Sequence, residues 1–249
     1  LVTRYGSGSP SGIDLYQNRF ILRHEDAGPI TNANIGQYDK DDDIDIHFTS
    51  NAGALVVDND TELHIPQWYL FTPGGAVTTS PGGASPGGDV HIGTSATFTV
   101  AANAVSVGGS WDNNGTYSAS SGQTTTFTAT GTGKTVEAGS STYQHVTFNG
   151  SGGGWTVQTD NITVAGNLSL TTGGAWTLAS GRTLEVRGTF ANSIPSVTTW
   201  TGSTLYLNSG TSYTVGSKTQ AAEVYGALQI GADTTVRMWN ASSTAVTTP

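Results

Sequence analysis

Residues 162–190 read ITVAGNLSLTTGGAWTLASGRTLEVRGTF and contain one phrase twice. Val164-Ala165-Gly166-Asn167-Leu168 recurs further along as Val186-Arg187-Gly188-Thr189-Phe190. Each copy has an aliphatic residue, a corner that contains glycine, and a second apolar residue. A fixed period of about 22 residues is typical of a solenoid, in which each repeat packs on the next.

The period extends on both sides of this stretch. An earlier copy is Val107-Gly108-Gly109-Ser110-Trp111, while Phe127 and Phe148 close two similar Thr-rich segments and Leu205 and Leu228 open two more. Between these points, segments of three to five residues alternate apolar residues with Thr or Ser. Three such strands fit in one repeat. The sequence therefore predicts an all-β fold, a single-stranded right-handed parallel β-helix (β-solenoid) of about nine or ten coils.

Two regions depart from the regular pattern. Residues 1–38 are expected to form an N-terminal extension or cap, which would pair with a neighbouring subunit. Within it, residues 15–23 predict either a strand or a short helix, and we favour a strand because no helix start signal precedes them beyond Ser11. Residues 39–249 are expected to form the solenoid, interrupted by a Pro- and Gly-rich loop at 73–88.

The composition narrows the classes of partner. Only 11% of the 249 residues are charged, against roughly 25% in ordinary soluble domains. The net charge is −9, and the nine Lys and Arg residues form no cluster, so we expect no nucleic acid partner. The sequence contains no run of 18 apolar residues, so we expect no membrane insertion. The Gly- and Thr-rich, Lys-poor composition, without cysteine, favours a secreted or cell-surface protein.

Three phrases carry a resemblance to known proteins: residues 146–150 (VTFNG), 162–170 (ITVAGNLSL) and 184–190 (LEVRGTF). They resemble the β-helical repeats of large bacterial extracellular and cell-surface proteins, such as filamentous adhesins and autotransporter passenger domains. The resemblance covers about residues 90–249 and implies the architecture. Pectate-lyase-like enzymes and phage tailspikes share the same shape, so the resemblance implies no single function.

An acid-aliphatic-His phrase occurs three times before the regular repeats begin. The copies are Asp45-Ile46-His47, Glu62-Leu63-His64 and Asp89-Val90-His91. In a strand the acid and the histidine lie on the same side, opposite the aliphatic residue. If the three strands stack, these six polar side chains form an outward ladder. One hypothesis is a metal site or a pH-sensitive contact face; the other is a solvated outer surface.

The run Asp39-Lys40-Asp41-Asp42-Asp43-Ile44-Asp45 gives a second candidate site. Alternating carboxylates at Asp39, Asp41, Asp43 and Asp45 are ligands of the kind that Ca²⁺ prefers. The alternative is a solvated turn that leads into the first coil. No other cofactor is expected.

Some residues suit chemistry on carbohydrates. A hydrolase needs two carboxylates at a set distance, but after residue 94 the acids lie about one per coil, so we predict no enzymatic activity. Those acids are Asp112, Glu137, Asp160, Glu185, Glu223 and Asp233. Trp68 and Tyr69 are candidates for stacking on a glycan. Trp155 and Trp176 are one period apart, and this spacing instead predicts stacked interior aromatics.

These observations leave three functional hypotheses. The first is a structural subunit of an extracellular bacterial filament or surface assembly, a homopolymer that grows head to tail through its solenoid ends. Its expected contacts are Leu1, Val2, Tyr5, Val236, Met238 and Trp239. The second is an adhesin or a rod like a phage tail fibre that binds surface glycans through Trp68 and Tyr69. The third is a polysaccharide lyase or hydrolase.

Overall fold

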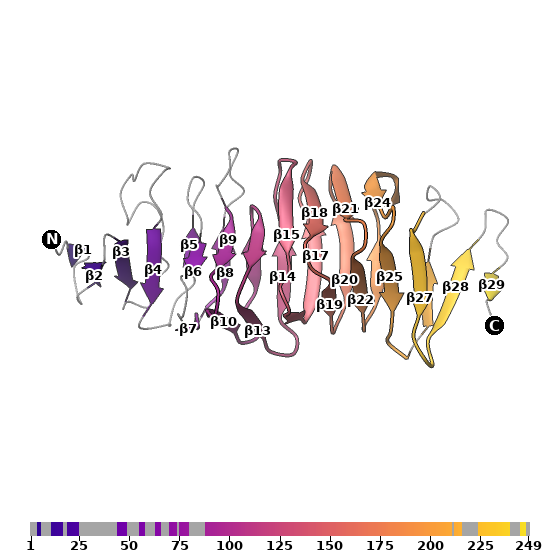
Figure 1. Ribbon diagram of the computed structural model, residues 1–249, viewed down its shortest axis with the longest axis horizontal. Coiled ribbons are helices and arrows are strands. Elements are labelled where there is room, and N and C mark those ends of the chain that lie inside the picture. The colour runs from indigo at the N-terminus through magenta and orange to yellow at the C-terminus, as the bar shows by residue number, and fades with distance from the viewer. Residues whose placement is uncertain are drawn as a thin grey trace.

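The structure is a computed structural model, and its strands stack side by side across one long axis (Figure 1). It describes residues 4–5, 11–16, 19–24, 44–48, 55–57, 63–65, 70–73, 75–79, 88–210, 212–215, 224–239 and 245–247. The first and last described strands, β1 (Arg4–Tyr5) and β29 (Ala245–Thr247), lie at opposite ends of the stack. The stacked sheets are parallel, and the predicted all-β solenoid is confirmed. The helical structure in the described residues is one 3₁₀ turn, Pro195–Val197.

Each turn contributes one strand to each of three faces. The parallel strands of the first face are β4 (Ile44–Phe48), β6 (Leu63–Ile65), β9 (Val90–Ile92), β12 (Trp111–Asn113), β15 (Lys134–Glu137), β18 (Gly154–Gln158), β21 (Ala175–Leu178) and β24 (Thr198–Thr199). At its N-terminal edge this sheet continues into β1 (Arg4–Tyr5), β2 (Ser11–Tyr16) and β3 (Arg19–His24), which pair with one another antiparallel. Residues 15–23 thus lie mainly in strands, as favoured from the sequence.

The second and third faces complete the turns. The second face holds two sheets. The first consists of β7 (Leu70–Phe71), β10 (Thr97–Val100) and β13 (Thr116–Ala119). The second consists of β16 (Thr142–Tyr143), β19 (Ile162–Val164), β22 (Thr183–Val186), β25 (Thr204–Leu207) and β27 (Ala227–Ile230). The third face holds β5 (Leu55–Val57), β8 (Val77–Thr79), β11 (Val105–Val107), β14 (Thr124–Phe127), β17 (His145–Asn149), β20 (Leu168–Thr172) and β23 (Phe190–Asn192).

The solenoid has about six complete turns, from β6 to β23, and not the nine or ten expected from a uniform repeat. One reason is that the turns are unequal, since the step from Val77 to its partner Val105 takes much more chain than the step from Thr97 to its partner Thr116. Another is that the C-terminal strands β26 (Ser212–Val215), β28 (Thr235–Trp239) and β29 (Ala245–Thr247) form a separate sheet, in which β29 runs antiparallel. The expected loop at 73–88 contains β8, and residues 80–87 lie outside the described part.

The interior consists of apolar rows that run along the stack. In each strand alternate side chains point inward, and parallel pairing places each inward side chain directly beside its counterpart in the next turn. On the second face one row is Ile162, Leu184, Leu205 and Leu228. Each large apolar side chain buried in this way contributes roughly 1.5–3 kcal/mol. Because a single turn has no row to pack against, the repeats stabilise one another.

Aromatic side chains fill the same interior. The rings of Phe127 and Phe148 are stacked with centroids 4.7 Å apart. Trp155 and Trp176 are paired in register and buried, which confirms the interior position predicted from their spacing of one period. These indole rings therefore belong to the core and not to an outer surface.

The repeated phrase that contains Gly166 and Gly188 forms the corner between the second and third faces. At this corner His145 Nδ1 accepts the Asn167 N–H at 2.9 Å, and Asn167 Oδ1 accepts the Thr189 N–H at 2.9 Å. Each corner side chain thus binds the backbone of the next turn. A Cβ atom at Gly188 would overlap the carbonyl group of Gly166, so glycine is required for the turns to approach this closely.

This corner gives a first prediction. Gly188→Ala should lower the free energy of unfolding by about 1–3 kcal/mol, because the new methyl group forces adjacent turns apart. Gly131→Ala is the matched control, since a Cβ atom there meets nothing within 4 Å. Urea unfolding followed by circular dichroism measures both. Equal effects of the two substitutions would contradict the steric explanation.

Candidate functional site

A row of polar side chains lies on the outer side of the first face. Strands β4, β6 and β9, which carry the three acid-aliphatic-His phrases, are consecutive neighbours in this sheet. His64 and His91 are in register, and their rings meet edge to face with centroids 4.6 Å apart. On its other side His91 Nδ1 lies 2.7 Å from Asp112 Oδ2, the residue in register on β12. The sheet thus aligns two imidazoles and a carboxylate in one line.

The row continues beyond the phrases found in the sequence. Asp112 is in register with Glu137, and Glu137 with Gln158. Gln158 Nε2 donates to Glu137 Oε1 at 3.0 Å, and Asn114 Nδ2 donates to Asp112 Oδ1 at 2.7 Å. The adjacent carboxylates of Asp112 and Glu137 are therefore each stabilised by a separate partner. We call His64, His91, Asp112, Glu137 and Gln158 the outer column.

Sequence reasoning missed the second half of the outer column. The signal was present, because Asp112 follows His91 by one period and Gln158 follows Glu137 by the same interval. A comparison of residues one period apart, in place of residues within a single strand, predicts both pairs. Chemically, His91 and Asp112 form a hydrogen-bonded pair of an imidazole and a carboxylate. His91 also contacts the ring of His64, and Asp112 accepts a hydrogen bond from Asn114.

Asp89 takes a different place from the one expected in a ladder. Its Oδ1 accepts the Ser110 N–H at 2.6 Å and lies 3.8 Å from Lys134 Nζ, two turns away. Burial raises the pKa of Asp89, while the bond from Ser110 and the charge of Lys134 oppose that shift. Lys134 itself is buried, because its side chain lies on the inward side of β15, as that of Val136 does. This internal ion pair was not anticipated from the sequence.

Several expected ligands cannot be placed. Asp39, Asp41, Asp43 and Glu62 lie outside the described residues. For Asp45 and His47 the structure gives the backbone of β4, in which Asp45 is in register with His64. Within the described part of the chain, no group of three or more His, Asp or Glu side chains is placed to hold a metal ion.

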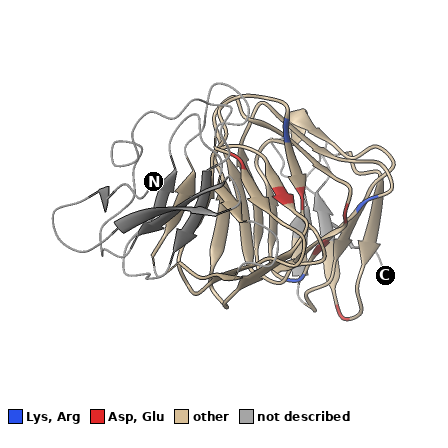
Figure 2. Cartoon of the chain, turned by 60° about the vertical axis from the view of Figure 1, so that its left-hand side comes forward, with Lys and Arg blue, Asp and Glu red and all other residues tan. Residues whose placement is uncertain are grey.

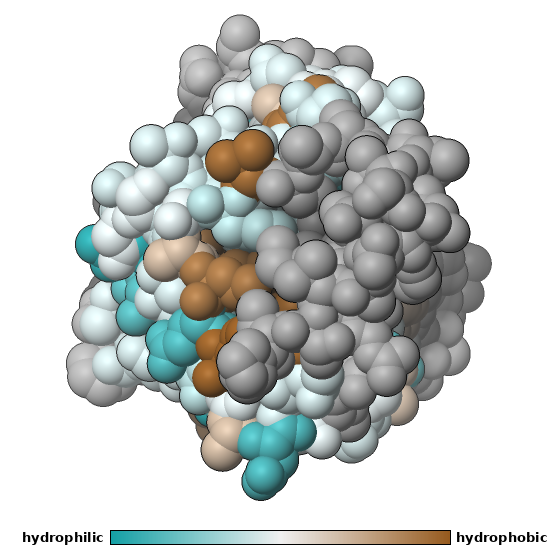
Figure 3. All heavy atoms as spheres, turned by 90° about the vertical axis from the view of Figure 1, so that its right-hand side faces the viewer, coloured by the Kyte–Doolittle hydropathy of each residue, from teal (hydrophilic) through white to brown (hydrophobic). Residues whose placement is uncertain are grey.

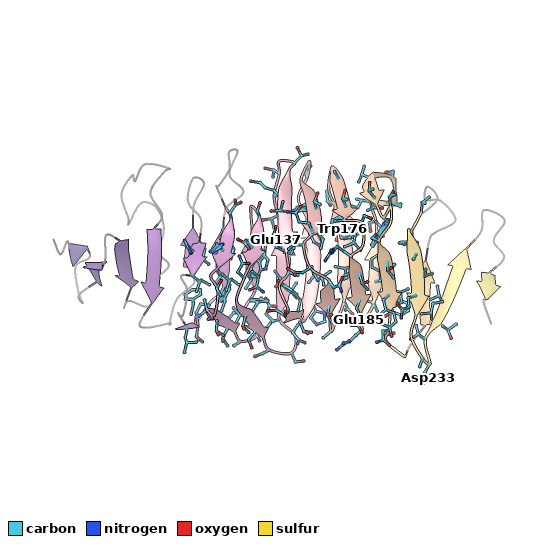
Figure 4. The ribbon with its side chains drawn as sticks, in the orientation of Figure 1. Glu137, Trp176, Glu185 and Asp233 are labelled. Atoms are coloured by element: carbon cyan, nitrogen blue, oxygen red, sulfur yellow. The ribbon has the colours of Figure 1, made fainter. Side chains whose placement is uncertain are left out.

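Charged side chains are sparse on the described surface. Figure 2 shows them scattered over the strands, and Figure 4 places Glu137, Glu185 and Asp233 at separate positions along the rod. Glu137 lies on the first face, Glu185 on the second, and Asp233 in the turn after β27. Trp68 and Tyr69, the candidates for glycan binding, lie outside the described residues, and Trp111, Trp155, Trp176 and Trp200 are buried.

Glu185 is the centre of a polar cluster on the second face. Its carboxylate accepts two hydrogen bonds from Arg187, at 2.8 and 3.0 Å, and one from Asn208 Nδ2 at 2.7 Å. The Arg187 bonds are the main cause that lowers the pKa of Glu185, against a smaller opposing effect of burial. The cluster ties the turn of β22 to that of β25.

The lowered pKa of Glu185 gives a pH-dependent prediction. Its carboxylate should stabilise the fold above the ordinary Glu pKa near 4.5, and this contribution should disappear as the pH falls through the lower pKa of the folded state. At pH 7 Glu185→Gln should cost less than about 1 kcal/mol, because Arg187 is half exposed. Once the pH falls below the lowered pKa of the folded state, the difference in stability between the variant and the wild type should disappear. Urea unfolding across this range is the measurement, and a difference that grows toward low pH would contradict it.

The C-terminal end of the stack exposes apolar side chains. Leu205 and Leu207 of β25 are fully buried, whereas Leu228 of β27 is half-buried and Ile230 is 40% exposed. Ile230 continues the inner row of Val164, Val186 and Leu207. Figure 3 shows apolar side chains gathered near the middle of this end. The inner rows thus reach the surface where the described turns stop.

The expected subunit contacts are placed only in part. Leu1 and Val2 lie outside the described residues, and Tyr5 belongs to β1. Val236, Met238 and Trp239 belong to β28, which pairs with β26 along one edge and with β29 along the other. Those two backbone edges are therefore occupied within the chain, whereas β27 ends its sheet.

Comparison of the chain with protein-family models, with curated proteins and with solved structures finds no match to any of them. Over the described residues, the structure has no helix long and apolar enough to cross a membrane.

Proposed function

We propose that the chain is a structural subunit of an extracellular bacterial filament or surface assembly, in which copies stack head to tail through their solenoid ends. The observation that carries this proposal is the partly exposed last row of β27, with Leu228 half-buried and Ile230 40% exposed. Covering such a row with another turn repeats the packing that already joins β25 to β27. The Gly- and Thr-rich, charge-poor composition supports the extracellular setting.

The chemistry of strand edges supports the same assembly. The last strand of a sheet presents backbone N–H and C=O groups that template the addition of another strand. Contacts between unlike ends do not close on themselves, so they produce a fibre and not a ring. Few charged side chains lie on the described turns, which limits the repulsion between copies at these turns.

Substitution of Ile230 tests this function. Wild-type protein should form filaments visible by negative-stain electron microscopy. Ile230→Lys should raise the concentration needed for assembly by ~10-fold or more, because the ammonium group would be buried in an apolar contact. The thermal unfolding of the monomer should change little, since Ile230 is already 40% exposed.

The matched control is Gln229→Lys, which adds the same charge to the same strand on the outer side of the sheet, in register with Tyr206. It should assemble like the wild type. The proposal fails if the wild-type protein stays monomeric at every concentration, or if the two lysine variants assemble equally well.

A further inference from the structure

A lysine amine and an aspartate carboxyl group meet at the inner side of the first face. Lys134 Nζ lies 3.8 Å from Asp89 Oδ1, and the two side chains are only 9% and 16% exposed. Lysine is almost never buried unless its charge is paired. In the following turns the inward position of Lys134 is taken by Trp155 and Trp176, which continue its row in register. A nucleophilic amine thus replaces an indole ring in an inner row.

Gly109 leaves the space in which the amine and the carboxyl group meet. The turn of β12 lies between those of β9 and β15 in the sheet. A Cβ atom at Gly109 would overlap Asp89 Oδ1, so the carboxyl group occupies the space that a side chain of the intervening turn would fill. The Ser110 N–H fixes the same oxygen, at 2.6 Å. The intervening turn therefore holds the carboxyl group of one turn beside the amine of another, two turns away.

We propose that Lys134 and Asp89 condense into an isopeptide bond, a covalent cross-link between two turns of the solenoid. The new bond joins Lys134 Nζ to Asp89 Cγ, and one water molecule leaves. The modification needs no oxidant, cofactor or second protein, and it is independent of the assembly proposed above. Because the chain contains no cysteine, no disulfide can fasten its turns, and this bond supplies a covalent link of another kind.

The reaction balances within the pair. The ammonium group of Lys134 first gives a proton to Asp89 Oδ2, which leaves a neutral amine beside a neutral carboxylic acid. Nζ then attacks Cγ, and the Ser110 N–H stabilises the negative charge that develops on Oδ1. A second proton passes from Nζ to Oδ2, and this oxygen leaves as water. Oδ1 remains as the carbonyl oxygen of the amide, and the last proton remains as its N–H.

The buried site favours this condensation. Two charges removed from water are costly even when they are paired, and an amide carries neither charge. Burial raises the pKa of Asp89, which favours the neutral acid that the first proton transfer produces. The fold also holds both groups in place, so their reaction is unimolecular. The flexible stem of lysine lets Nζ turn from Oδ1 toward Cγ without movement of the backbone.

Intact-mass spectrometry of the purified chain tests the bond. Most wild-type molecules should weigh less than their sequence by one water molecule. Lys134→Arg and Asp89→Ala should each have the full mass of their sequence, and the arginine keeps the positive charge, so it separates ion pairing from amide formation. Chymotrypsin cuts after aromatic residues between the two positions, such as Trp111. In digests of the wild type, the peptides that contain Asp89 and Lys134 should remain joined.

The matched control is Glu185→Ala, which removes a carboxylate paired with an arginine and should leave the loss of one water in place. Wild-type protein at the full mass of its sequence would overturn the proposal. A loss of one water that persists in Lys134→Arg protein would also overturn it, since the water would then come from another site. The joined peptides identify the bond in the wild type whether or not a variant folds.

Discussion

Each inward side chain packs against the inward side chain of the same row in the next turn, and the rest of the structure depends on this contact. Strands supply the two-residue alternation that separates inside from outside, and parallel register carries each row from turn to turn. The corner at Gly166 and Gly188 must be tight enough to keep that register, which is why a side chain is excluded there. A stack built in this way has open rows wherever its turns stop.

The outer side chains follow the same register without contributing to the core. Polar groups that are far apart in the sequence therefore meet in columns, as His91 meets Asp112 and Glu137 meets Gln158. Glu185, Arg187 and Asn208 form a comparable link across two turns of the second face. Such pairs are partly exposed, and each contributes little to the free energy of unfolding. They nevertheless give the few charged side chains of the described surface a hydrogen-bonding partner.

Much of the architecture could be predicted from the sequence, because the period and the alternation are local signals. The interior positions of Trp155 and Trp176 followed directly from their spacing. The number of turns did not, since the length of a turn varies from the short step between Thr97 and Thr116 to the long one between Val77 and Val105. The ion pair between Asp89 and the buried Lys134 also could not be predicted from the sequence, because it joins residues two turns apart.

The candidate contact surface at β27 was likewise only partly predictable from the sequence. The row of Leu184, Leu205 and Leu228 is visible as a repeat in the sequence, but its exposure at one end is a property of the folded stack. Under the proposed function, the packing that joins one turn to the next within the chain would also join one copy to the next.

X-ray diffraction from aligned filaments tests this central claim most directly. If subunits continue the solenoid, strands lie across the filament axis, and the strand spacing of about 4.8 Å gives a strong reflection along that axis. A strand-spacing reflection perpendicular to the axis, or filaments without one, would contradict the account.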